Sequence, residues 1–202
     1  MNCEKRYYGS FNPADYDYFV LAGDIGGTHT ALGVAGVNNN QNSPKLLFSF
    51  RYNSAGLKNL FEPVNEILKH AYYAHSIEIS KACFGVAGPV KAHSYSKPTN
   101  LDWAVDAKEI LSKTMLGSVI ILNDFEAIGY GVNILNHNNK NDVIRLGRKN
   151  SGQSSQANMT KAVIGAGTGL GKSILVYDAH CKAYVPIQSE GGHADFPVHD
   201  EE

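Results

Sequence analysis

Residues 163–176 read VIGAGTGLGKSILV, a glycine-rich segment close to two nucleotide-binding signatures. In both the P-loop and the dinucleotide fingerprint, a helix begins where the glycine-rich turn ends, and its N-terminus helps to hold phosphate. Here Gly-Lys-Ser at 171–173 leads into Ile-Leu-Val-Tyr at 174–177 and then into the turn residues Asp178 and Ala179. A short β-branched and aromatic run that ends in a turn is typical of a strand. The segment therefore predicts the tip of a β-hairpin, with a P-loop or dinucleotide enzyme as the alternative.

Residues 23–34, GDIGGTHTALGV, have the same organisation: a strand, a Gly/Thr turn and a returning strand. This weak self-similarity is of the kind that gives two structurally similar lobes. Glycine allows positive φ and close approach, so that N–H groups of such turns can converge on an anion. Two such hairpins could hold a polyphosphate, and Asp24 could reach a Mg²⁺ ion on it. Two ordinary glycine-rich hairpins are the alternative.

The rest of the chain predicts an α/β fold with a mixed sheet, because a meander of three strands is followed by alternating strands and helices. We expect the first lobe to span 1–135 and the start of a second lobe to span 136–202. The hydrophobic pattern predicts strands at 18–24, 29–37, 45–52, 81–88, 118–124, 162–167, 172–178 and 182–188, and helices at 57–72, 104–116 and 125–135.

Two acidic residues, Asp24 and Asp124, follow apolar strands, so both are expected at strand carboxyl ends. In open α/β sheets, ligands bind at that edge. Asp124 could serve only as a helix N-cap. A carboxylate in a partly dry crevice can also take a proton from an alcohol that attacks a γ-phosphate. The neighbouring Asn123 offers an amide for a hydroxyl group.

A further polar turn, SEGGHADF at 189–196, carries Glu190 and His193. A surface turn with a structurally bonded histidine is the plainer interpretation. The spacing H-x-D-x₃-H-D at 193–200 could also be a metal site, but no second cluster of ligands supports it.

Composition excludes several classes of function. The 202 residues are 43% hydrophobic and carry a net charge of −1, enough apolar material for a proper core and no basic stripe for nucleic acid. We expect no membrane span, because no apolar run approaches about 18 residues, and no signal peptide is visible. The three widely spaced cysteines favour a reducing, cytoplasmic environment.

Taken together, the motifs resemble those of bacterial-type glucokinases in the actin and hexokinase superfamily. The matching segments appear in the family's order and are LAGDIGGTHTALG (21–33), FGVAGPV (84–90), TNLDW (99–103), ILNDFEAIGYG (121–131), GAGTGLG (165–171) and EGGHADF (190–196). The resemblance implies an actin/ribonuclease H-like mixed sheet flanked by helices, followed by the beginning of a second, similar lobe.

The resemblance also implies roles for individual residues. Asp124 would be the general base on the sugar 6-hydroxyl, and Asp24 would lie near Mg²⁺. The first phosphate loop would be Gly26, Gly27 and Thr28, and the second would include Gly167 and Thr168. The sugar hydroxyls would be bound by Asn100, Asn123, Glu190 and His193.

The implied function is ATP-dependent phosphorylation of glucose at the 6-hydroxyl, the first step of glycolysis, in a cytoplasmic enzyme that binds glucose, ATP and Mg²⁺. A homodimer is a further expectation, and a non-catalytic sugar-binding module or an inactive fragment is the alternative. Two residues depart from the family pattern: His29 replaces an Asn, and Lys172 follows the second hairpin. The family also runs well beyond residue 202, so we interpret the chain as the N-terminal part of such a protein.

Overall fold

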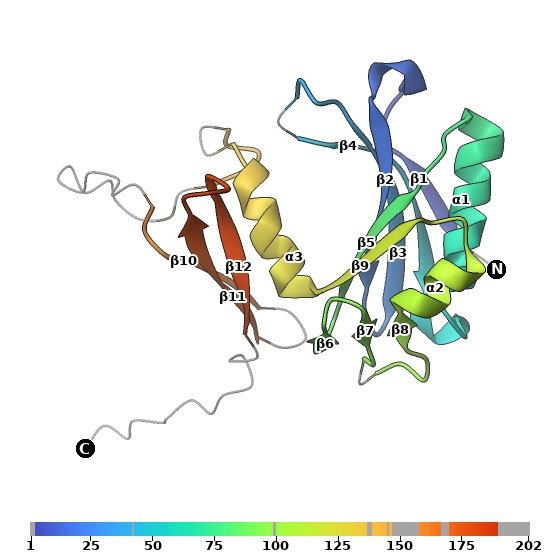
Figure 1. Ribbon diagram of the computed structural model, residues 1–202. Helices are drawn as coiled ribbons and strands as arrows, with labels where there is room; N and C mark the ends of the chain where they lie inside the picture. The colour runs from blue at the N-terminus through green and yellow to red at the C-terminus, as the bar shows by residue number, and fades with distance from the viewer. Residues whose placement is uncertain are drawn as a thin grey trace. The chain divides into compact units, whose positions relative to one another are not determined.

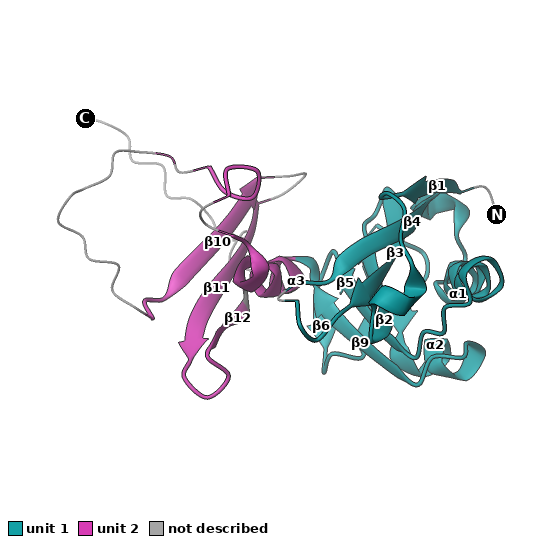
Figure 2. Ribbon diagram, turned by 90° about the horizontal axis from the view of Figure 1, so that it is seen from above, with its two compact units in different colours: residues 1–124 teal, residues 125–202 magenta. Residues whose placement is uncertain are grey.

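The computed structural model describes residues 3–41, 43–98, 100–136, 139–144, 146, 158–166 and 170–189. The chain forms two compact units, residues 1–124 and 125–202 (Figure 2). The boundary between the units thus falls directly after Asp124. The lobe boundary at 135/136 stays a prediction.

The first unit is built on a mixed six-stranded sheet with the strand order β1-β4-β3-β2-β5-β9 (Figure 1). Strands β2, β3 and β4 form the predicted antiparallel meander, and β5 and β9 continue the sheet parallel to β2. The short β1 adds an antiparallel edge next to β4. The strands are β1 (Glu4–Tyr7), β2 (Tyr18–Ile25), β3 (His29–Val37), β4 (Lys45–Asn53), β5 (Lys81–Val86) and β9 (Ser118–Asn123).

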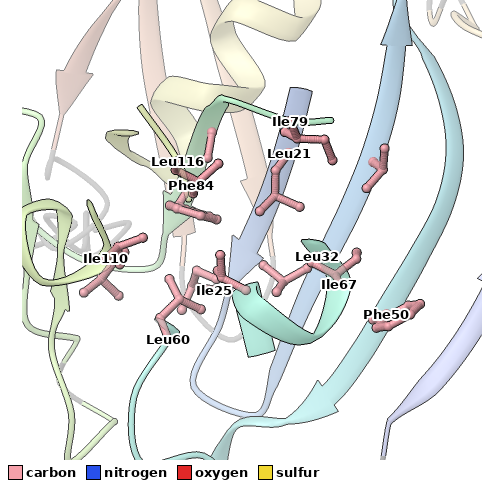
Figure 3. Close-up of a cluster of buried hydrophobic side chains, with 14 of the residues drawn as sticks. Leu21, Ile25, Leu32, Phe50, Leu60, Ile67, Ile79, Phe84, Ile110 and Leu116 are labelled. Atoms are coloured by element: carbon pink, nitrogen blue, oxygen red, sulfur yellow. The ribbon is translucent and has the colours of Figure 1, made fainter. Parts of the chain in front are cut away.

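Two helices, α1 (Phe61–His75) and α2 (Ala107–Lys113), pack with the sheet around one hydrophobic core. In Figure 3, Leu21, Leu32 and Phe50 from the strands lie close to Ile67 of α1. Side chains that alternate with these along β2, such as Ala22 and Asp24, are exposed. The period-2 pattern of β2 thus buries one face of this strand and leaves its other face open.

The bounds of both helices differ from those that their apolar patterns predict: α1 is shifted toward the C-terminus, and α2 is shorter. Helix α1 begins at Phe61, so Pro63 lies in its first turn, where its missing N–H costs no helical hydrogen bond. Helix α2 begins after Asp106, whose carboxylate accepts from the Lys108 N–H at 2.8 Å, and ends at Lys113. Met115, which lies within the range predicted for this helix, is beyond its end and is 92% exposed.

A small three-stranded sheet follows β5, with the order β6 (Val90–Lys91), β7 (Tyr95–Ser96) and β8 (Val105–Asp106). The connection from β7 to β8 carries Asn100 between the buried Ser96 and the buried pair Leu101 and Trp103. Single 3₁₀ turns occur at Pro13–Asp15, Ser54–Gly56 and Val132–Ile134.

The second unit contains most of α3 (Asp124–Gly131) and an antiparallel sheet of β10 (Lys161–Ala166), β11 (Leu170–Asp178) and β12 (Ala183–Ser189). Gly165 and Gly171 are paired across β10 and β11, and the Phe125 ring covers both. A Cβ at position 171 would lie 1.8 Å from that ring, so only glycine allows this packing. Among the described residues, no helix is long and apolar enough to cross a membrane.

Candidate functional site

The candidate site lies at the carboxyl ends of the parallel strands β2, β5 and β9. Their register aligns Ile25, Val86 and Asn123 in one row, so the residues that follow each of them lie at the same edge of the sheet. The Ala87 N–H donates to the Ile25 carbonyl at 3.1 Å, which ties two of these ends together. We call this region, residues 26–28, 87–88 and 123–124, the ligand edge.

The first glycine turn, Gly26 to Thr28, joins β2 to β3 at the ligand edge. The turn is closed by the Gly26 N–H, which donates to the His29 carbonyl at 2.9 Å. The side chains of Thr28 and His29 are exposed. The turn therefore presents the hydroxyl group of Thr28 and backbone amides at the ligand edge.

Asn100 lies against this turn. A Cβ on Gly27 would come within 2.9 Å of the Asn100 Cβ and 3.3 Å of its Nδ2, which is closer than side chains normally pack. The buried neighbours Leu101 and Trp103 anchor the segment in the core, while the Asn100 side chain is exposed. A sugar-binding candidate and a phosphate-binding candidate are thus in direct contact.

Asn123 ends β9 and is 7% exposed. Its Nδ2 donates to the Gly88 carbonyl at 3.2 Å, which fixes the turn after β5 against the end of β9. Gly88 has a φ of 140°, a conformation that side-chain-bearing residues rarely adopt. Asp124 follows as the first residue of α3 and is half-buried. The structure therefore brings Asn123 and Asp124 to the same edge as the first glycine turn.

Asp24, the candidate near the metal ion, is the penultimate residue of β2 and lies on the open face of the sheet. Loss of hydration raises the pKa of its carboxyl group above the usual value, and the positive charge of Arg51 opposes this shift. Among the described residues, no three potential ligands cluster tightly enough to hold a metal ion alone. The single carboxylate of Asp24 is compatible with Mg²⁺, which proteins commonly hold through one or two carboxylates together with substrate phosphates.

Four predicted site residues, Gly167, Thr168, Glu190 and His193, lie outside the described residues. The strands around the second glycine turn are described, and Ala166 of β10 pairs with Leu170 of β11. Lys172 lies within β11, paired with Ile164 and Ser189. The P-loop and dinucleotide alternatives are therefore wrong, because a strand follows the glycines where both motifs need a helix.

In a comparison with known protein families, the glucokinase family model matches residues 21–202 of this chain. The glucokinase of Nostoc sp. is 36% identical over 182 residues, which are 90% of this chain and 49% of the relative. The glucokinase of Psychromonas ingrahamii is 31% identical over 176 residues, again 49% of its length. The chain spans about half the length of the curated relatives it matches.

Solved structures of glucokinases have a fold similar to that of this chain. The crystal structure of a glucokinase from an Antarctic psychrotroph has a TM-score of 0.70 and 28% identity, and the match covers 91% of this chain and 53% of that one. A Balamuthia mandrillaris glucokinase in complex with glucose also has a TM-score of 0.70, at 21% identity, with coverage of 92% and 51%. These neighbours place the mixed sheet among the actin-like sugar kinases.

Proposed function

This chain belongs to the glucokinase family, and we propose that the protein transfers the γ-phosphoryl group of ATP to the 6-hydroxyl of glucose. The proposal concerns the whole protein, because the chain spans about half the length of its relatives. The observation that carries it is the meeting of the Gly26–Thr28 turn, Asn100, Asn123 and Asp124 at one edge of the sheet.

On the sugar side, amides and a carboxylate suit the recognition of hydroxyl groups. Asn100 and Asn123 would hydrogen-bond the sugar, together with Glu190 and His193 from the second unit. A site that pairs a substrate's hydroxyls rejects analogues that lack them, because its own polar groups are then left unpaired. Selectivity for one hexose would follow from this arrangement.

Asp124 would act as the general base. The carboxylate would take the proton of the 6-hydroxyl as that oxygen attacks the γ-phosphorus in line. Its half-buried position directly after β9, at the same edge as the Gly26–Thr28 turn, suits this role.

On the phosphate side, the backbone amides and hydroxyl of Gly26–Thr28 would bind the transferred phosphate, and Gly167 and Thr168 would also contribute to its binding. Asp24 would hold Mg²⁺ together with phosphate oxygens. The ion would neutralise charge that develops on the transferring group.

We also propose a cytoplasmic enzyme, in keeping with its dispersed cysteines, and a homodimer remains a prediction.

Asp124→Asn in the full-length protein tests the proposed function. The substitution keeps the shape and a hydrogen-bonding side chain but removes the base. We expect turnover to fall by at least about a hundredfold, while glucose affinity changes far less. Turnover close to that of the wild type would remove Asp124 as the base. Glucose binding with no turnover in the wild type would favour a sugar-binding module instead.

A further inference from the structure

Two hydroxyl groups are fully buried behind the first glycine turn. Thr30 of β3 and Ser54, the first residue of the Ser54–Gly56 3₁₀ turn, both have 0% exposure. β3 and β4 pair with His29 opposite Asn53, and this register brings Ser54 next to Thr28. Most buried hydroxyl groups in proteins are hydrogen-bonded, and the partners of these two show what they hold in place.

Ser54 makes two hydrogen bonds to the turn itself. Its hydroxyl donates to the Gly26 carbonyl at 2.7 Å, and its backbone N–H donates to the Thr28 carbonyl at 2.9 Å. One serine therefore holds the carbonyl groups at both ends of the three-residue turn.

Thr30 supports the serine. The two hydroxyl oxygens are 2.9 Å apart, and a hydroxyl has a single proton. Since the Ser54 proton is used on Gly26, Thr30 must donate to Ser54. The result is a directed chain from Thr30 through Ser54 to the Gly26 carbonyl, and such chains strengthen each bond within them.

The N–H groups of the turn differ from its carbonyl groups in their hydrogen bonding. Within the described part of the chain, the N–H groups of Gly27 and Thr28 have no hydrogen-bond partner, whereas the Gly26 N–H is used in closing the turn. Successive amides whose carbonyls are held elsewhere can converge on an anion.

We propose that Ser54 is a positioning residue for phosphoryl transfer, which orders the Gly26–Thr28 turn so that its free amides meet the phosphate. This inference rests on the proposed function of that turn. It assigns Ser54 no contact with substrate. It does predict that loss of one hydroxyl, in the core behind the turn, weakens phosphate binding without disturbing the sugar residues at Asn123 and Asp124.

The test combines backbone ¹⁵N relaxation with titration of inorganic tripolyphosphate and Mg²⁺ into the 202-residue chain. Ser54→Ala should make the amides of Gly26, Gly27 and Thr28 mobile and weaken tripolyphosphate binding about tenfold, the equivalent of one well-formed hydrogen bond. Thr30→Val should do the same to a smaller degree, because Ser54 keeps its bond to Gly26. The control is Thr114→Val, which loses a 2.8 Å bond from a hydroxyl to the Ile110 carbonyl at the end of α2.

Each outcome has a distinct meaning. A turn that stays as rigid in Ser54→Ala as in the wild type overturns the positioning role, whatever binds there. A mobile turn with unchanged tripolyphosphate affinity overturns its link to phosphate. A rigid wild-type turn that binds no tripolyphosphate, but becomes mobile in Ser54→Ala, overturns the proposed function of the turn, and the inference falls with it. An equal effect of Thr114→Val shows a general loss of stability and contradicts the proposal.

Discussion

Asn100 lies directly against the backbone of Gly27, so that a Cβ at position 27 would meet the Asn100 Cβ at 2.9 Å. This contact joins the proposed sugar side of the site to its phosphate loop within a single unit. Both partners are held from behind, Gly27 by the closed turn and Asn100 by the buried Leu101 and Trp103. A side chain added at Gly27 should therefore displace Asn100.

Gly27→Ala tests that coupling. The new methyl group cannot fit without moving Asn100, and the contact is with its Cβ rather than with a flexible end. We expect glucose affinity and tripolyphosphate affinity to fall together, by about tenfold each, because close contacts at a binding site transmit small displacements. Calorimetric titration of each ligand measures both effects.

The matched control is Gly117→Ala, because a Cβ there meets only the Ser80 carbonyl oxygen, at an ordinary 3.7 Å. Loss of tripolyphosphate affinity with unchanged glucose affinity in Gly27→Ala would show that the two subsites are independent.

Lys172→Ala should matter little for phosphate binding. The residue lies within β11 and not at a helix start. We expect the affinity for tripolyphosphate with Mg²⁺ to stay within about twofold of the wild type, as is usual for substitutions away from a site. Fluorescence or calorimetric titration provides the measurement, and a loss of binding to the level expected for a P-loop lysine would contradict the hairpin assignment.

Gly171→Ala should destabilise the second unit. The Phe125 ring occupies the space that the new methyl group needs, at 1.8 Å. Overpacking of this kind typically costs about 1–3 kcal/mol. Urea denaturation of the 202-residue chain, followed by a probe in the second unit, measures the change.

A smaller side chain should relieve this cost. The double variant Gly171→Ala with Phe125→Leu is expected to recover part of the stability lost by Gly171→Ala, and Gly131→Ala, where a Cβ meets open space, serves as the control. A double variant less stable than the sum of the two single changes would argue against the ring contact.

The lowered pKa of His70 on α1 predicts that the free energy of unfolding depends on pH. Burial lowers the pKa of His70, and the charges of Lys5 and His75 lower it further, against the opposing effect of Glu66. Its Nε2 is 2.6 Å from the Tyr7 hydroxyl, which links α1 to β1.

Because its folded pKa is lowered, the folded state takes up a proton on His70 less readily than the unfolded chain does. In the unfolded chain, the imidazole of His70 has a pKa of about 6.5. The unfolded chain therefore binds more protons than the folded state as the pH drops through that value, and the free energy of unfolding decreases. In His70→Gln, the free energy of unfolding should vary less between about pH 7.5 and pH 5. The control is His180→Gln, at an exposed histidine outside the first unit, and the comparison of the two variants separates the effect of His70 from the loss of any one histidine. An unchanged slope in His70→Gln would contradict the assignment.

The sequence predicts most of the fold because its signals are local. The strands and the hairpin at 161–178 follow from apolar runs and turn residues, and the structure confirms them. The ends of α1 and α2 are less predictable. The Asp106 cap sets the start of α2, and the helix ends at Lys113, so that Met115 lies outside it.

The site is predictable to a lesser extent. Motif residues that end parallel strands must meet at one edge, so Asn123 and Asp124 could be placed from the sequence. The long-range hydrogen bonds that hold the site could not be predicted from the sequence. Ser54 reaches Gly26 across 28 positions and Asn123 reaches Gly88 across 35, and no local pattern records such contacts.

A titration of glucose into the ¹⁵N-labelled 202-residue chain, observed amide by amide, tests whether the sugar binds at the ligand edge. If glucose binds at the ligand edge and the adjoining Asn100, the amide chemical shifts of Gly27, Asn100, Asn123 and Asp124 should change saturably. These changes should be lost in Asp124→Ala. Saturable shifts confined to other parts of the chain, or glucose binding that persists unchanged in Asp124→Ala, would contradict a sugar site at the carboxyl ends of β2, β5 and β9.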